Sequence, residues 1–190
     1  KDNSTVQLTA YQQPTLFDDL RPEWNDLLRR SPSDRVFSTW EWQVSWWNAY
    51  QPGQLWVLVC RSDEGQLIGL APWFIENHPQ RGRVVRSIGC VEVTDYLDVI
   101  VDTAYVEPVL HHVAEYLQNH HTDYDIVDLC NLPETSVGYT QFPAILSEHG
   151  FDTTIKQQEV CPVIQLPHTW DAYLEQLDKK QRHEIRRKLR

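Results

Sequence analysis

The pattern of hydrophobic and polar positions in this 190-residue chain switches several times between a period of two and a period near 3.6. Short alternating runs, and continuous apolar runs bounded by turn residues, predict β-strands. The turn 62–65 joins two such runs into a hairpin, and Pro72 in the second run predicts a bulge or an edge position. The expected strands are Val6–Ala10, Leu55–Arg61, Gln66–Glu76, Val84–Ile88, Leu97–Val101, Ile126–Leu129, Asp152–Gln158 and Val163–Leu166.

Apolar residues spaced three and four positions apart predict helices between these strands. Pro22 opens the first helix. Ser38 and Glu41 have the spacing of a capping box, which places the start of the second helix at Ser38. Gly150 stands where the left-handed residue after a helix belongs. The expected helices are 22–30, 38–50, 106–119, 142–149 and one long helix from Thr169 that is still running at Arg190.

The resulting order is β, α, α, four strands, α, β, α, two strands, α. Mixed order with adjacent hairpins predicts an α/β fold in which a sheet of mixed direction is covered by helices on both faces.

A length of 190 residues suits one large domain. The chain contains no methionine, even at position 1, so we expect it to be a piece of a longer protein or a trimmed chain.

Composition limits the functional classes. Hydrophobic residues at 41% and charged residues at 23% are typical of a soluble globular protein. No run of 18 apolar residues is present, so no membrane span is expected. The polar start of the chain lacks the apolar core of a signal peptide, and we therefore expect a cytoplasmic protein.

The net charge of −10 is unevenly distributed. Residues 1–178 carry 10 basic and 26 acidic side chains, whereas residues 179–190 carry seven basic side chains and one acidic. The acidic body opposes phosphate surfaces, which argues against a nucleic-acid partner. The basic end is expected to be a solvated helix that pairs with the acidic body or with a further unit.

The four cysteines contain no C-x-x-C motif, which argues against a zinc ribbon or a thioredoxin-type site. Cys60, Cys130 and Cys161 stand in apolar settings, and buried free thiols in a reducing cytosol are expected. The pairs His111-His112 and His120-His121 are expected to face solvent and to hold no metal, because adjacent helical residues point about 100° apart.

The eight tryptophans are concentrated near the second helix. Trp40, Val44 and Trp47 share one helical face, which indicates core packing. Trp42 and Trp46 lie on the other face. Two interpretations of that second face remain open: further core packing, or an aromatic platform that binds a substrate such as a sugar or an acyl group.

Four local phrases occur in order along the chain. They are Phe37-Ser38-Thr39-Trp40-Glu41-Trp42 with Ser45-Trp46-Trp47, then Leu67-Ile68-Gly69-Leu70-Ala71-Pro72-Trp73, then Thr94-Asp95-Tyr96-Leu97-Asp98, and the helix from Trp170 through Tyr173 and Arg182 to Lys188. Together with the element order, these phrases resemble the GNAT-like acyltransferase fold, in the form of the cellulose-biosynthesis-associated, Fem-like double-GNAT proteins.

The resemblance implies two GNAT-like units in tandem. Residues 1–168 would form the N-terminal unit, and residues 169–190 the linking helix into a second unit that is absent from this chain. The implied activity is transfer of an acyl group from acetyl-CoA or another acyl-CoA to an amine or hydroxyl acceptor, such as a sugar. The second unit would bind the acyl-CoA, and this half would shape the acceptor side.

Residues 101–108 indicate which of the two units would bind the acyl-CoA. In a working unit of the family, a loop of the form Q/R-x-x-G-x-G/A holds the CoA pyrophosphate at a helix N-terminus, where glycine allows close approach. The corresponding residues 101–108 contain no glycine, two carboxylates (Asp102 and Glu107) and Pro108. We therefore expect no cofactor binding in this unit.

The catalytic residues are not identified by any complete motif. The weak candidates are Asp95, Tyr96 and Asp98, which the resemblance places in a cleft shared with the second unit, where an acid could orient an amine or act as a base. Turn chemistry and surface charge are the alternative explanation for the two acids. The alternative function is a non-catalytic, GNAT-derived module that binds a partner or glycan.

Overall fold

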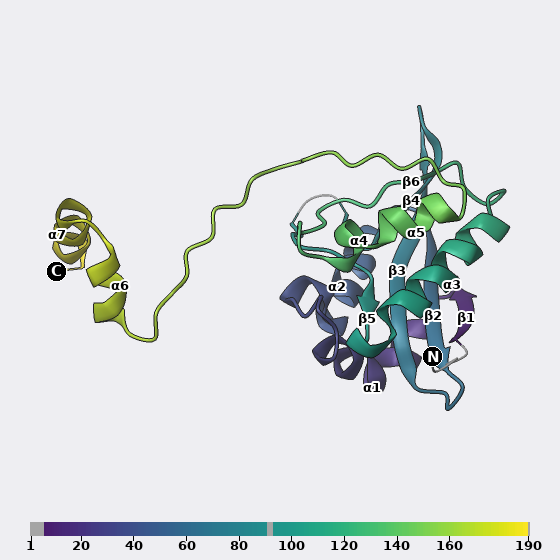
Figure 1. The fold of residues 1–190 in the computed structure, drawn as a ribbon, viewed down its shortest axis with the longest axis horizontal. Coiled ribbons are helices and arrows are strands. Elements are labelled where there is room, and N and C mark those ends of the chain that lie inside the picture. The colour runs from purple at the N-terminus through teal and green to yellow at the C-terminus, as the bar shows by residue number, and fades with distance from the viewer. Residues whose placement is uncertain (1–5, 91–92, 190) are drawn as a thin grey trace. The chain divides into compact units, whose positions relative to one another are not determined.

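The computed structural model describes residues 6–90 and 93–189. The chain divides into two units, Lys1–Ile155 and Lys156–Arg190, and each is described by itself. The first unit contains the sheet and its covering helices (Figure 1). No helix among the described residues is both long enough and apolar enough to cross a bilayer.

The first unit is built on one sheet of mixed direction. Its strand order is β1-β2-β3-β4-β6, and the short strand β5 pairs with β3 beyond the end of β4. The pair β4 and β6 is parallel, and the other recorded pairs are antiparallel. The strands are β1 (Val6–Tyr11), β2 (Gln54–Ser62), β3 (Leu67–His78), β4 (Gly82–Ser87), β5 (Ile100–Val101) and β6 (Ile126–Val127). The sheet of mixed direction predicted from the sequence is thereby confirmed.

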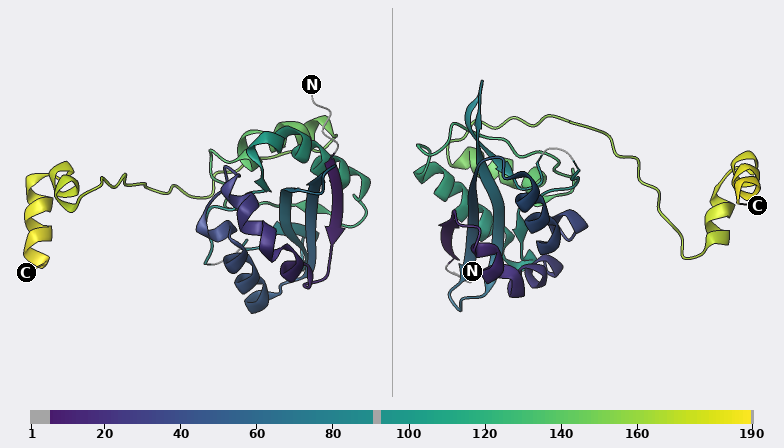
Figure 2. Two further views of the ribbon diagram at one scale, coloured as in Figure 1. Left: turned by 90° about the horizontal axis from the view of Figure 1, so that it is seen from below. Right: turned by 180° about the vertical axis from the view of Figure 1, so that it is seen from behind.

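Helices cover both faces of this sheet, as the sequence predicts (Figure 2). One buried cluster joins α1 and α2 to one face, and a second joins α3 and α5 to the other. The helical elements are α1 (Leu16–Arg29), η1 (Val36–Ser38), α2 (Trp40–Tyr50), η2 (Thr103–Tyr105), α3 (Val106–Asn119), α4 (Val137–Thr140) and α5 (Phe142–Glu148).

Pro72 lies in the central strand β3 rather than at an edge. It pairs with Val57 of β2, and its carbonyl accepts a hydrogen bond from the Ile88 backbone N–H at 2.8 Å. Pro72 therefore lies in a gap on this side of β3, between the residues that pair with β4 and those that pair with β5, so an N–H at this position would have no strand to bond to. A central strand tolerates proline here because no ladder hydrogen bond is lost.

Two helix starts differ from the predictions. Helix α1 begins at Leu16, six residues before Pro22, because burial of the stripe formed by Leu16, Leu20 and Trp24 outweighs the hydrogen bond that an internal proline removes. The cap of α2 is Thr39 instead of Ser38, and the Thr39 hydroxyl accepts from the Trp42 N–H at 3.3 Å.

The second unit corrects two further predictions. Residues 152–168 are exposed and form no strand, so the predicted strands Asp152–Gln158 and Val163–Leu166 are wrong for this structure. The predicted long helix is two helices, α6 (Trp170–Gln176) and α7 (Lys179–Lys188). Asp178 separates them because its carboxylate caps α7 through the Gln181 N–H, in a capping box that competes with continuation of α6.

Candidate functional site

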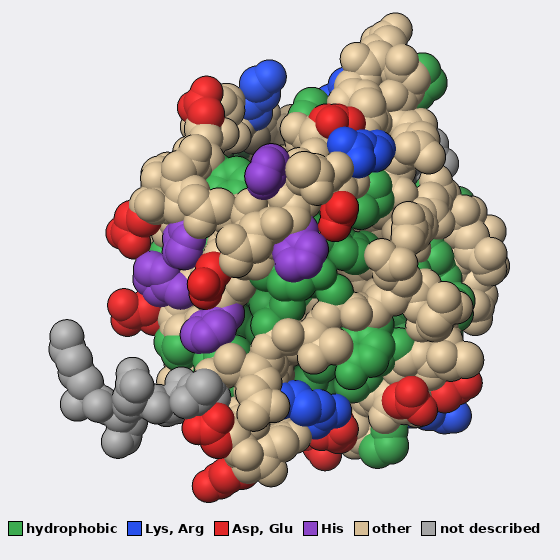
Figure 3. Space-filling view, turned by 90° about the vertical axis from the view of Figure 1, so that its right-hand side faces the viewer, with side chains coloured by type: hydrophobic (Ala, Val, Ile, Leu, Met, Phe, Trp, Pro, Cys, Tyr) green, Lys and Arg blue, Asp and Glu red, His purple; other side chains and the backbone are tan. Residues whose placement is uncertain are grey.

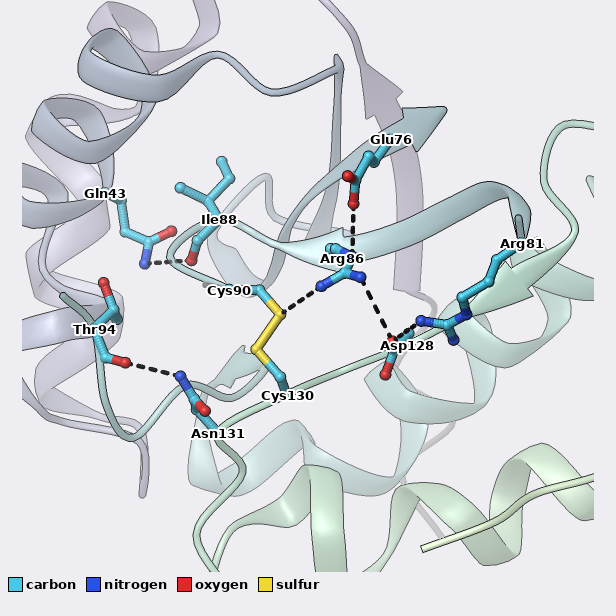
Figure 4. The surroundings of a disulfide bond; sticks show 10 residues. All are labelled: Gln43, Glu76, Arg81, Arg86, Ile88, Cys90, Thr94, Asp128, Cys130 and Asn131. Carbon is cyan, nitrogen blue, oxygen red and sulfur yellow. Dashed lines mark hydrogen bonds and ion pairs between the residues drawn. A yellow bond between two sulfur atoms is a disulfide. The ribbon is translucent and has the colours of Figure 1, made fainter. Parts of the chain in front are cut away.

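The loops that follow the parallel strands β4 and β6 leave the same edge of the sheet. In α/β sheets, ligands bind beyond the carboxyl ends of parallel strands. A disulfide between Cys90 and Cys130 joins the two loops, with the Cα atoms 5.8 Å apart (Figure 4). The expectation that these two cysteines are free thiols is therefore wrong, because the parallel pairing brings together residues that are 40 positions apart.

The other two cysteines are unpaired. Cys60 is buried, as predicted, and its burial raises the pKa of the thiol to about 12, which makes the thiolate inaccessible at neutral pH. Cys161 is exposed in the second unit, contrary to the prediction of a buried thiol, because the strands expected before and after it do not form.

Hydrogen bonds and strained backbone also mark the two joined loops. The Leu97 N–H donates to the Asn131 carbonyl at 2.9 Å, and the Asn131 side-chain amide donates to the Thr94 carbonyl at 2.8 Å. Three non-glycine residues here have positive φ: Val93 at 71°, Tyr96 at 56° and Asn131 at 58°. Non-glycine residues in this region carry strain, and such strain concentrates at functional sites.

Asp98 lies buried between these loops and α4. Its carboxylate accepts hydrogen bonds from the Ser33 hydroxyl at 2.8 Å and from the backbone N–H groups of Val99, Val137 and Gly138 at 2.9–3.1 Å. Burial raises the pKa of Asp98 above its ordinary value, while the four hydrogen bonds act in the opposite direction. With both oxygens engaged, the carboxylate is placed to hold α4 against the loop.

The sequence-predicted Trp42 and Tyr96 lie on either side of Phe37. The Trp42 ring meets the Phe37 ring edge-on, with centroids 4.9 Å apart, and the Tyr96 ring lies 6.2 Å from Phe37. The Trp42 indole N–H donates to the Thr94 hydroxyl at 3.0 Å. These contacts place Trp42 beside the loop that carries Asp95, an exposed acid.

Trp46, the other predicted substrate-binding residue, lies in the core. It is 5% exposed and packs against Phe74, with ring centroids 5.9 Å apart. The second face of α2 therefore divides: Trp46 packs on the sheet, and Trp42 reaches the loop at the strand ends.

Gln43 is a residue that sequence reasoning missed. It is 1% exposed, and its amide N–H₂ donates to the carbonyls of Phe37 at 2.8 Å and Ile88 at 3.2 Å. It thus ties η1 to the end of β4, as the Ile88 contact in Figure 4 shows. A glutamine between tryptophans in an apolar helix was the available signal, because a buried amide must find partners.

Large apolar side chains are exposed on the segments joined by these contacts. We call Val36, Val93, Tyr96 and Tyr139 the apolar rim; their exposed fractions range from 36% to 64%. Exposed apolar side chains that gather at one place mark binding surfaces more often than scattered ones do. Exposed apolar side chains are therefore present on η1, on the loop after β4 and on α4.

The N-terminal end of α3 is the place where the family resemblance expects a CoA pyrophosphate. The Asp102 carboxylate already accepts from the Ala104 N–H at 3.0 Å and pairs with the Arg30 guanidinium at 2.6 Å. The Thr103 N–H donates to the Arg30 carbonyl, and the Tyr105 N–H to the Asp102 carbonyl. This turn, η2, does not fit a pyrophosphate, since its own N–H groups are already bonded within the chain and the Asp102 carboxylate lies among them.

Histidine and acidic side chains gather on one face of the first unit (Figure 3). His111 on α3 lies 3.4 Å from His149 at the end of α5, measured between ring nitrogens, and His120 stacks on Tyr116. Within residues 6–90 and 93–189, no group of three or more His, Cys, Asp or Glu side chains is placed to hold a metal ion.

A shallow depression of about 340 Å³ lies at the opposite edge of the sheet, at the amino ends of β4 and β6. Its walls are largely polar and contain none of the residues nominated from the sequence; they are Gln12, Gln54, Trp56, Ile75, Asn77, Arg83 and Asp123.

No family model and no curated protein matches the chain. Among solved structures, it is similar to glucosamine-6-phosphate N-acetyltransferase from Arabidopsis thaliana, with 15% identity, a TM-score of 0.49 and coverage of 83% of this chain and 98% of that one. An aminoglycoside 6'-N-acetyltransferase from Acinetobacter baumannii shows 10% identity and a TM-score of 0.48, over 85% of this chain and all of that one. A Trypanosoma brucei acetyltransferase shows 13% identity and a TM-score of 0.44, over 83% of this chain and all of that one. Similarities at this level carry no information about activity.

Proposed function

We propose that this chain is the acceptor-side unit of a GNAT-like N-acyltransferase of the Fem-like, double-unit type. A second GNAT-like unit of the same protein would bind acetyl-CoA or another acyl-CoA. The transferred acyl group would pass to an amine or hydroxyl on a small molecule or sugar. The proposed location is the cytoplasm.

The start of α3 carries this proposal. A unit that binds acyl-CoA needs free N–H groups in the turn that leads into this helix, and here the Ala104 and Thr103 N–H groups of that turn are already bonded to the Asp102 carboxylate and the Arg30 carbonyl. The role proposed for this unit is therefore to bind the acyl acceptor. The joined loops beyond β4 and β6, with Trp42 and Tyr96 around Phe37, offer aromatic faces of the kind that stack on sugar rings.

Within this proposal, Asp95 is the acid that remains accessible, since Asp98 spends both oxygens on hydrogen bonds. An exposed carboxylate beside an aromatic platform can accept a hydrogen bond from an amine acceptor and orient it. The role proposed for Asp95 is therefore to position the acceptor, and Trp42 and Tyr96 would bind its apolar face.

The test is calorimetric titration with acetyl-CoA of this chain and of the longer protein that the resemblance implies. We expect binding by the longer protein and a dissociation constant weaker than about 1 mM for the chain alone. Micromolar binding by the chain alone would overturn the acceptor-side assignment. Absence of binding by the longer protein would overturn the enzymatic function and favour the non-catalytic binding module.

In the longer protein, Asp95→Asn is expected to lower kcat/KM by about tenfold or more without changing acetyl-CoA affinity. Glu134→Gln, which removes an exposed acid elsewhere on the joined loops, serves as the matched control and should leave the rate unchanged. Equal rates for Asp95→Asn and the unmodified protein would remove Asp95 from the site.

A further inference from the structure

The two sulfur atoms of the Cys90–Cys130 disulfide have different surroundings. Cys90 is 1% exposed, whereas Cys130 is only half-buried and belongs to a half-buried stretch, 127–133. An attacking thiol must approach a disulfide sulfur from outside, in line with the bond that breaks. Cys130 is therefore the cysteine through which a thiol from solvent can reach the bond, and Cys90 is the buried partner.

A guanidinium group stands beside the inner sulfur. The Arg86 Nη1 atom lies 3.8 Å from the Cys90 Sγ atom, and its Nε atom lies 2.8 Å from a Glu76 carboxylate oxygen. Figure 4 shows this side chain between Glu76, Asp128 and the disulfide. Arg86 is 15% exposed, so solvent screens its charge only in part. The Glu76 carboxylate pairs with the Nε side of the guanidinium and holds it in place, while the Nη1 N–H remains directed at Cys90 Sγ, where it stabilises a thiolate that forms on Cys90.

Asp128 does not cancel this charge, because it is engaged elsewhere. Its carboxylate lies 2.6 Å from the Arg81 guanidinium and 3.9 Å from that of Arg86. Arg81 therefore takes the close ion pair with Asp128, and Arg86 keeps one N–H group directed at the sulfur.

From this asymmetry we propose that Cys90–Cys130 is a thiol-exchange site with a fixed direction, whose reaction partner is a reducing dithiol. A thiolate of the dithiol attacks the Cys130 sulfur, the disulfide bond breaks, and its electron pair leaves on Cys90 as a thiolate beside Arg86. The second thiol of the reductant then attacks the mixed disulfide and releases Cys130. The protein gains two electrons and two protons, and the dithiol loses the same number as it becomes a disulfide.

Reduction would remove one covalent link between the loops beyond β4 and β6. The hydrogen bonds from Leu97 to Asn131 and from Asn131 to Thr94 do not involve sulfur and remain available. Because Cys130 is half-buried, the exchange would take place at the boundary between protein and solvent. This inference does not depend on the acyl-transfer proposal.

The direction of exchange can be read from the first product. The chain is treated briefly with glutathione in the presence of iodoacetamide, which alkylates the released thiol, and the products are mapped by peptide mass spectrometry. We expect glutathione on Cys130 and the alkyl group on Cys90, in about fivefold excess over the opposite arrangement. A product mixture with glutathione mainly on Cys90, or equally on both, overturns the proposal.

The role of Arg86 is tested by the rate of reduction with dithiothreitol. Arg86→Gln is expected to lower this rate about threefold to tenfold, because a leaving thiol of higher pKa departs more slowly. Arg83→Gln, which removes another cation of β4 that pairs with Asp125 rather than with Asp128, is the matched control and should change the rate by less than about twofold.

Equal rates for Arg86→Gln and Arg83→Gln would overturn the role of Arg86. If circular dichroism shows that Arg86→Gln is unfolded, Arg86→Lys replaces it and is expected to reduce at a rate near that of the unmodified chain. A rate for folded Arg86→Lys that falls as far as tenfold would then count against stabilisation by charge.

Discussion

Each oxygen of Asp98 accepts two hydrogen bonds. One receives the N–H groups of Val99 and Gly138, and the other receives the Ser33 hydroxyl and the Val137 N–H. A buried carboxylate is tolerated only with such a full set of donors. Asp98 therefore links three segments at a single point: the loop between α1 and η1, the residue before β5, and helix α4.

Asp98→Asn is expected to lower the free energy of unfolding by about 1–3 kcal/mol. The new amide N–H₂ must face either the pair Val99 and Gly138 or the Val137 N–H, and two donors cannot satisfy each other. Urea unfolding followed by tryptophan fluorescence measures the loss.

The control for Asp98→Asn is Asp95→Asn, three residues earlier and exposed. This change should alter the free energy of unfolding by less than about 0.5 kcal/mol, since surface substitutions have small effects. If both variants had the same free energy of unfolding, the buried hydrogen bonds to Asp98 would not stabilise the fold as predicted.

Prediction of site residues from the sequence reached only some of this arrangement. Trp42 and Tyr96 were nominated and do meet around Phe37, but Trp46, nominated with them, is in the core. Helical periodicity places Trp42 and Trp46 on one face of α2. In the structure, only the part of that face that carries Trp46 packs on the sheet, and Trp42 contacts the loop after β4. The position of the sheet edge depends on strands 10 to 40 residues later, which the periodicity of α2 cannot report.

At the scale of elements, α3 packs closely on β3 because Gly69 has no side chain. A Cβ atom added at Gly69 would lie 2.6 Å from a Val109 methyl carbon, well inside van der Waals contact. Val109 is fully buried in the cluster that joins α3 to the sheet. The glycine therefore sets the distance between this helix and the central strand.

Gly69→Ala is expected to destabilise the first unit by about 1–3 kcal/mol, through overpacking against α3. Val109→Ala removes the two methyl groups in the way, so the double variant should lose less stability than the two single changes added together. Urea unfolding of the three variants gives the coupling energy. Strict additivity would show that the helix shifts freely and that the close contact is not limiting.

The local sequence predicted the boundaries of helix α3 more accurately than those of several strands. Helix α3 begins and ends where the apolar periodicity placed it, at Val106 and Asn119. The expected strand Leu97–Val101 shrinks to Ile100–Val101, and the strands expected after residue 151 do not form. A helix satisfies its backbone within its own residues, whereas a strand needs a partner whose position local sequence does not specify.

At the scale of the molecule, the boundary between the two units lies after Ile155, within a stretch, 152–166, that is exposed and forms no helix or strand. Limited trypsin digestion is expected to cut early after Lys156, the one basic residue in this segment. Exposed backbone that forms no helix or strand is a preferred site of proteolysis.

The released first unit should keep its cooperative thermal unfolding, with a Tm within about 3 °C of the intact chain, because its core contains no residue after 151. Circular dichroism of the purified fragment measures this. A fragment that has lost cooperative melting would show that the second unit contributes to the fold of the first.

The amino-acid order by itself was enough to predict features formed by near neighbours, such as the hairpin at 62–65 and the periodicity of α3. It was not enough to predict contacts between distant residues. The Cys90–Cys130 bond spans 40 positions and the Arg30–Asp102 pair spans 72. Such contacts exist because β4 and β6 run parallel and α1 ends beside the turn that follows β5. The path of the whole chain, rather than any local preference, brings those elements together.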